Sequence, residues 1–240
     1  MCDTWNGFAC TAFTFEDHPA IVVFPHGESN GRLALKTEYW GAFPQTELLL
    51  LQKGFHLCYI QNDNRWGTAA DLDRKARFVE FVAGEYGLSP RCVPVGMSCG
   101  GLFAILFAAA YPGLVSCLYL DAPVVNYMSC PCGFGVGHPL AENCDEILQA
   151  LGLGSISRLL AYRDMPLDRL PALVEAKIPV VMVAGDSDTT VPYCENGLLL
   201  QEAYEAAGLP LAVFIKPGCD HHPHGLADPT PVVEFILQHP

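Results

Sequence analysis

Short apolar runs alternate with segments of helical periodicity along most of this 240-residue chain. Apolar runs bounded by turn residues are typical of buried strands, and apolar positions that repeat at the helical period are typical of helices. Strands are expected over residues 8–17, 20–24, 55–60, 93–97, 115–120, 178–184 and 211–216. Helices are expected over residues 43–54, 71–86, 102–110, 166–176, 195–207 and 231–238.

This alternation predicts the fold class. Strands that alternate with helices form a mostly parallel sheet with right-handed crossovers and flanking helices. We expect one α/β domain over residues 1–240, with 8–17 as an early antiparallel strand and the continuously apolar 20–24 as a central parallel strand. Residues 122–165 break the rhythm, being rich in Gly, Pro and Cys before short helical pieces. Such a long irregular segment predicts a cap or lid over a site.

The apolar run from Val93 ends in Gly96-Met97-Ser98-Cys99-Gly100, and a long apolar helix-forming stretch follows it. This is the strand–turn–helix context of a nucleophile elbow, in which a strained turn exposes the serine hydroxyl at the sheet edge. Alone, the motif is equally compatible with a small-residue turn that leads into a buried helix. A serine nucleophile also needs a base and an acid that orients it, in the chain order Ser, Asp or Glu, His.

Candidate acids follow the strand expected over 178–184. Asp186 and Asp188 stand just past its carboxyl end, where open α/β sheets place their sites. One of them is expected to orient the histidine and the other to make a loop turn, and spacing does not choose between them. Asp121, at the end of the strand over 115–120, is a third choice that we expect to line the substrate pocket instead.

Candidate bases follow the last expected strand. His221, His222 and His224 stand in the segment after Lys216, and one must reach both Ser98 and the acid. Three imidazoles can also bind zinc, but adjacent histidines tend to point apart, so we expect no metal and no cofactor.

An oxyanion hole needs two N–H donors aimed at one point. The Cys99 N–H follows the nucleophile, and the second donor is expected at Gly27 or Glu28, in the loop after 20–24. Four aromatic residues in loops or near strand ends are candidates for stacking against the substrate, although aromatic side chains often only pack: Tyr39, Trp40, Trp66 and Tyr127, of which we select Trp40 and Tyr127.

Composition limits the partners. Apolar residues make up 51% of the chain, charged residues 16%, and the formal net charge of −13 argues against nucleic acid and anionic membranes as partners. The apolar stretches are too short to cross a bilayer, and the first residues resemble no secretion signal. We therefore expect a cytoplasmic protein whose eleven cysteines are reduced thiols.

Taken together, Gly96–Gly101, Gly185–Pro192 and His221 resemble the α/β-hydrolase superfamily over nearly the whole chain. Residues 41–46, 53–56, 121–124 and 221–231 look like a bacterial esterase-like branch that accompanies polysaccharide breakdown, similar to acetyl xylan esterases and prolyl-oligopeptidase-type hydrolases. The resemblance implies Asp188 as the acid and His221 as the base. The family turn Gly-x-Gly-His reads Gly218-Cys219-Asp220-His221 here, which leaves His222 and His224 open.

The expected function is a serine esterase that cleaves small acyl esters through an acyl-enzyme, with acetyl or aryl esters on plant carbohydrates as the substrates that the resemblance implies. A peptidase or amidase with the same triad is one alternative, and a hydrolase-fold protein that binds a ligand with little turnover is another. The expected partner is a small-molecule ester, and a homodimer is left open.

Overall fold

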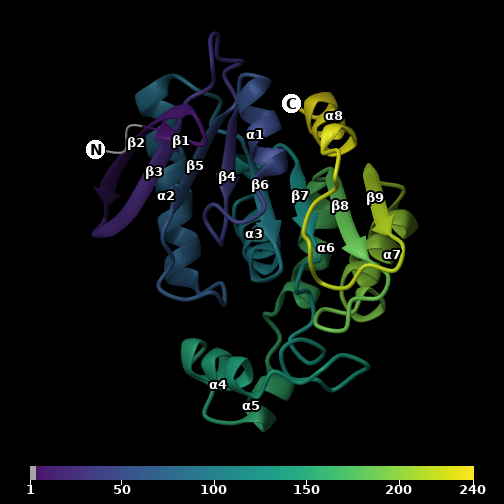
Figure 1. The fold of residues 1–240 in the computed structure, drawn as a ribbon. Helices are drawn as coiled ribbons and strands as arrows, with labels where there is room; N and C mark the ends of the chain where they lie inside the picture. The colour runs from purple at the N-terminus through teal and green to yellow at the C-terminus, as the bar shows by residue number, and fades with distance from the viewer. Residues whose placement is uncertain (1–3) are drawn as a thin grey trace.

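The computed structural model describes residues 4–240, and a twisted sheet forms its centre (Figure 1). Within these residues the strand order is β1-β2-β3-β5-β4-β6-β7-β8-β9. Neighbours are antiparallel from β1 to β5 and parallel from β5 to β9. The strands are β1 (Thr4–Trp5), β2 (Phe8–Phe15), β3 (His18–Val23), β4 (Leu33–Lys36), β5 (His56–Ile60), β6 (Cys92–Met97), β7 (Leu118–Asp121), β8 (Val180–Gly185) and β9 (Leu211–Lys216).

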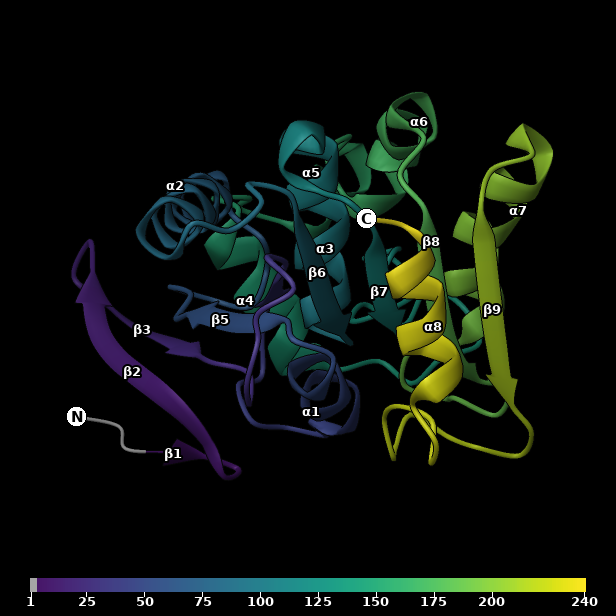
Figure 2. The same cartoon turned by 90° about the horizontal axis from the view of Figure 1, so that it is seen from above.

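Helices cover both faces of the sheet (Figure 2). The α-helices are α1 (Gln45–Gln52), α2 (Ala69–Tyr86), α3 (Cys99–Ala110), α4 (Ala141–Ala150), α5 (Ile156–Ala161), α6 (Pro166–Ala176), α7 (Gly197–Ala207) and α8 (Thr230–Gln238). Helices α1 and α8 pack on one face over a core that includes Leu50 and Val232. Helices α2, α3, α6 and α7 pack on the other face, over a core that includes Phe103 and Leu200. The expected mostly parallel α/β sheet is therefore confirmed.

Two strand predictions need correction. The run 20–24, predicted as a central parallel strand, belongs to β3, which pairs antiparallel with both β2 and β5. Its apolar character reflects burial and carries no information on strand direction. The central position is held by β4 (Leu33–Lys36), a four-residue strand between β5 and β6 that the apolar pattern did not reveal.

Residues 122–165 leave the sheet after β7 and carry α4 and α5 beyond the carboxyl ends of the parallel strands (Figure 1). The segment is tied to the sheet domain by polar contacts. The buried Asn196 accepts hydrogen bonds from the N–H groups of Val125 and Asn126, both at 3.0 Å. Arg65 reaches α4 and donates to Glu146 at 2.8 Å. This segment therefore lies where a cap over the carboxyl edge of the sheet would lie.

The thiol prediction holds only in part. Nine cysteines within the described residues are free, but Cys10 is disulfide-bonded. No helix in residues 4–240 combines the length and the apolar character that crossing a membrane requires.

Candidate active site

Ser98 stands on the sharp turn between β6 and α3. Its φ of 51° lies in the left-handed region, where a residue with a side chain is strained. The turn can be this tight because of its glycines: a Cβ on Gly96 would lie 2.4 Å from the carbonyl oxygen of Gly100. A Cβ on Gly101 would lie 2.5 Å from the Cβ of Pro123. Side chains at these positions would push strand and helix apart, so the glycines are what allow the serine hydroxyl to stand clear of the sheet.

His221 contacts both Ser98 and Asp188. Its Nε2 lies 3.0 Å from the Ser98 Oγ, and its Nδ1 lies 2.7 Å from the Asp188 Oδ2. The second carboxylate oxygen of Asp188 accepts the N–H groups of Thr190 at 2.9 Å and Val191 at 2.7 Å, which fixes the carboxylate in place. Asp188 and His221 are both buried. The structure thus brings together the three side chains that the sequence singled out, each from a loop at the carboxyl edge of the sheet.

The other candidate acids have different partners. Asp186 is exposed, and its Oδ1 accepts the N–H of Gly218 at 2.7 Å. Asp121 is buried and holds His224, whose Nδ1 lies 3.0 Å from the Asp121 Oδ1. Tyr119 donates its hydroxyl proton to the other Asp121 oxygen at 3.2 Å. Asp188 is therefore the acid that contacts His221, and Asp121 forms a second carboxylate–histidine pair beside it.

The predicted oxyanion donors lie at opposite edges of the sheet. Cys99 is the first residue of α3, so its N–H belongs to the first turn, which has no intrahelical acceptor. Gly27 and Glu28, in contrast, are exposed and lie at the opposite edge of the sheet. Because β3 runs antiparallel to β5, it ends where the parallel strands begin, and the N–H of Asn30 accordingly bonds the carbonyl of Gly54. The prediction of a donor at Gly27 or Glu28 is wrong.

The loop that does reach Ser98 follows the unpredicted strand β4. Thr37 donates its hydroxyl proton to the carbonyl of Gly100 at 2.7 Å, which fixes this loop against the first turn of α3. Tyr39, in the same loop, lines the pocket beside Ser98 together with Cys99 and Arg65. Burial, first of all, and the nearby Cys99 raise the pKa of Tyr39 well above its usual value. The phenol therefore stays protonated and can donate a hydrogen bond.

A pocket of about 330 Å³ opens beside Ser98, Cys99 and His221, a size that suits a small organic ligand. Most of its walls are apolar. The 122–165 segment supplies part of them, and Arg65 and Asn143 add polar groups. The remaining residues of the lining are Tyr39, Ala42, Phe43, Trp66, Met97, Cys130, Leu140, Thr190, His222 and His224.

The three residues selected as substrate contacts, Trp40, Asp121 and Tyr127, lie outside the pocket lining, which is a further correction. Trp40 stacks on Tyr59 with ring centroids 5.4 Å apart, and Tyr127 is buried with its hydroxyl donating to the carbonyl of Trp66 at 3.3 Å. The carboxylate of Asp121 is hydrogen-bonded to the Nδ1 of His224, at 3.0 Å. None of these three side chains lines the pocket beside Ser98. Tyr39, the residue before Trp40, and Trp66, whose carbonyl accepts the Tyr127 hydroxyl, do line it.

No family model matches the chain. Among solved structures it is similar to dipeptidyl peptidase 4 from Porphyromonas gingivalis (TM-score 0.69, 15% identity, 99% of this chain and 36% of that chain). It is also similar to the acylaminoacyl peptidase from Pyrococcus horikoshii (0.68, 16%, 90% and 38%). A carboxylesterase from Lactobacillus plantarum matches with a TM-score of 0.63, 13% identity and coverage of 90% of this chain and 84% of that chain.

This chain therefore spans little more than a third of the length of the two peptidases and most of the length of the carboxylesterase. At these identities the likeness concerns the fold. With the strand order of the sheet and the turn at Ser98, it establishes that the chain has the α/β-hydrolase fold.

Proposed function

We propose that this protein is a serine hydrolase that cleaves carboxylic esters of small acyl groups through an acyl-enzyme. One observation carries the proposal: the His221 ring lies 3.0 Å from the Ser98 hydroxyl and 2.7 Å from the Asp188 carboxylate, beside an apolar pocket. A hydroxyl, an imidazole and a carboxylate in this relation are the groups that nucleophilic acyl transfer requires.

In the proposed reaction the Ser98 Oγ attacks the ester carbonyl while the His221 Nε2 accepts the hydroxyl proton. Asp188 holds the Nδ1 proton of His221 and stabilises the imidazolium. The tetrahedral intermediate then collapses: the bond to the alkoxy oxygen breaks, and His221 gives its proton to the leaving alcohol. Water repeats the sequence on the acyl-enzyme, releasing the acid and restoring the Ser98 hydroxyl.

For the oxyanion of the intermediate we propose the Cys99 N–H and the Tyr39 hydroxyl as donors. Both residues border the pocket next to Ser98. A protonated phenol in a site sheltered from water stabilises developing negative charge strongly, because it replaces solvent without having to reorient.

Tyr39→Phe is expected to lower kcat for a short ester by about 10²- to 10³-fold with a small change in KM, since only the transition state carries the oxyanion. Steady-state kinetics on a p-nitrophenyl ester measure this split. Tyr86→Phe is the matched control, because Tyr86 packs against Phe24 and does not line the pocket. If Tyr39→Phe hydrolysed the ester at the full rate, the Tyr39 hydroxyl would not be part of the oxyanion hole.

The acyl group that the pocket favours is small and apolar, because the walls are mostly hydrocarbon and the volume is near the lower end for ligand sites. Acetyl or aryl esters on plant carbohydrates are the substrates we propose, and the motif resemblance over 41–46 and 221–231 supports them. Peptide cleavage is the second candidate, because two of the similar structures are peptidases.

A direct comparison tests the proposal: rates on p-nitrophenyl acetate, acetylated sugars and a peptide p-nitroanilide, with a fluorophosphonate probe mapped by mass spectrometry. We expect turnover of the esters, little of the anilide, and the probe on Ser98. Faster cleavage of the anilide would assign the same triad to a peptidase. Absence of both turnover and labelling would favour a ligand-binding protein.

A further inference from the structure

We propose that His221, His222 and His224 together form a binding site for a divalent transition-metal ion such as Zn²⁺. A bound ion would occupy the base of the proposed triad, so the inhibitory part of this inference rests on the proposed function. The binding part rests on the three side chains alone.

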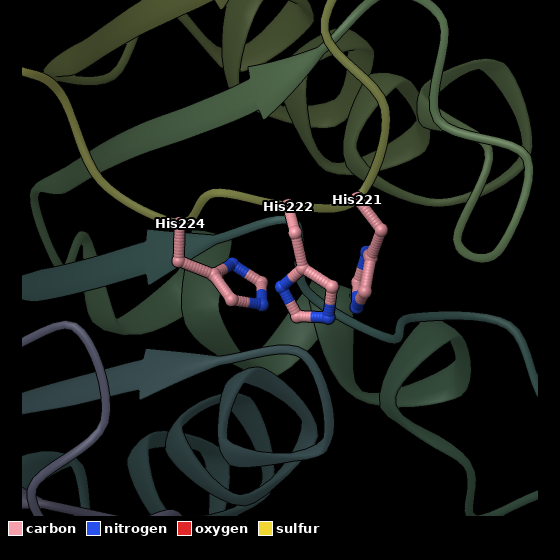
Figure 3. Close-up of side chains that lie close together, drawn as sticks. All are labelled: His221, His222 and His224. Carbon is pink, nitrogen blue, oxygen red and sulfur yellow. The ribbon is translucent and has the colours of Figure 1, made fainter.

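The three imidazoles are gathered on the loop between β9 and α8 (Figure 3). One nitrogen of each ring lies within 4.8 Å of one nitrogen of each of the others. Their ring centroids are 5.0, 4.8 and 4.9 Å apart in the three pairs, so the rings form a nearly equilateral cluster. Among the residues that the structure describes, no other group of three ligating side chains comes together in this way.

Two of the rings are already oriented as metal ligands usually are. His221 has its Nδ1 on Asp188 at 2.7 Å, and His224 has its Nδ1 on Asp121 at 3.0 Å. Both carboxylates are buried. A carboxylate on one ring nitrogen fixes the tautomer, directs the other nitrogen outward and makes it a better ligand. The Nε2 atoms of both rings are therefore the atoms left to bind an ion.

His222 supplies the third, adjustable ligand. Its ring is exposed and stacks on Phe43, with centroids 5.6 Å apart and planes 14° from parallel. Zinc–nitrogen bonds are about 2.0–2.1 Å long, so a small inward turn of this exposed ring is needed to close the site.

The ligand set selects the kind of ion. Imidazole nitrogens suit Zn²⁺, Cu²⁺ and Ni²⁺, whereas Mg²⁺ and Ca²⁺ require oxygen ligands. The coordinate bond to the His221 Nε2 would replace its hydrogen bond to Ser98, using the lone pair that otherwise accepts the serine proton. A bound ion therefore blocks the attack step without any change in oxidation state.

Isothermal titration calorimetry of Zn²⁺ into the Ser98→Ala protein tests binding separately from activity. We expect one ion per chain. Removal of a hydrogen-bond partner behind a metal ligand lowers metal affinity by roughly 10- to 100-fold, and His222→Ala removes a ligand itself, so we expect its Zn²⁺ affinity to fall by at least that factor. His26→Ala is the matched control, because this exposed histidine stacks on Phe8 outside the cluster. Cys194→Ser controls for an exposed thiol as the ligand. Mg²⁺ is expected not to bind.

The outcomes separate this inference from the proposed function. Zn²⁺ binding that His222→Ala does not weaken, or that Cys194→Ser removes, would overturn the site. Histidine-dependent binding without inhibition of ester hydrolysis would show that the ion does not reach His221, and would overturn the blocking step. Ester hydrolysis with no Zn²⁺ binding would reject the metal site alone, and Zn²⁺ binding in a protein that hydrolyses nothing would reject the proposed function alone.

Discussion

Ser98→Ala is expected to lower kcat on a short p-nitrophenyl ester by about 10⁶-fold, the loss typical of removing a triad nucleophile. The alanine retains the turn and the pocket but has no atom that can form the acyl-enzyme. The activity that remains comes from binding and from the oxyanion donors, which still act on a water molecule. Initial rates at saturating ester, measured at high enzyme concentration, give the size of the loss.

Ser116→Ala serves as the control for this loss. Ser116 is also a buried hydroxyl residue, but it bonds the carbonyl of Cys92 at the opposite edge of the sheet. Its variant is expected to hydrolyse the ester at the rate of the unmodified protein. Circular dichroism should show both variants folded. A Ser98→Ala protein that is folded and still fully active would mean that another group attacks the ester.

Asp188→Asn is expected to lower kcat by about 10⁴-fold while the protein stays folded. The amide can donate a hydrogen bond to the His221 Nδ1, which places the ring proton on Nε2 and leaves no lone pair facing Ser98. The amide also cannot stabilise the imidazolium. Labelling of Ser98 by a fluorophosphonate also requires His221 to accept the hydroxyl proton. The labelling rate should therefore fall in parallel with the rate of ester hydrolysis, and comparison of the two rates checks this explanation.

Asp186→Asn is the matched control, two residues away on the same loop. Asp186 only accepts hydrogen bonds, from the N–H of Gly218 at 2.7 Å and the Ser187 hydroxyl at 3.0 Å, and an asparagine oxygen can replace it. Its variant is expected to hydrolyse esters within about a factor of two of the parent, as a surface substitution normally does. If Asp186→Asn were the inactive variant, the 2.7 Å contact between Asp188 and His221 would have no catalytic meaning.

The candidates Ser98, Asp188 and His221 could be predicted from the sequence because each stands at or shortly after the end of an apolar run. Parallel strands bring their carboxyl ends to one edge, so residues after different strands meet there. The choice between Asp186 and Asp188, or among the three histidines, was not readable from spacing. It depends on which way each side chain leaves its loop, and on the two N–H donors that hold Asp188.

The error over Gly27 and Glu28 has one cause. A continuously apolar strand shows that both of its faces are buried but not which way it runs, and β3 runs opposite to its neighbour β5. The strand that does lead to the site, β4, is only four residues long and gives too little pattern to stand out. The side chain of Tyr39 was consequently known only as one aromatic residue among several.

Two parts of the chain form the pocket beside Ser98, and they differ in how much change of sequence they can accept. The proposed reactive groups stand on turns at the ends of β6, β8 and β9, and a methyl group on Gly96 or Gly185, at the ends of β6 and β8, would collide with backbone atoms. The far walls come from Cys130, Leu140 and Asn143, on the long 122–165 segment, which is joined to the sheet domain by buried apolar side chains as well as by polar contacts. Insertions and deletions in the pocket-lining part of this segment would change which acyl groups fit, and they would leave the positions of the proposed triad unchanged. The substrate preference of such a protein can therefore change without a change in its reactive residues.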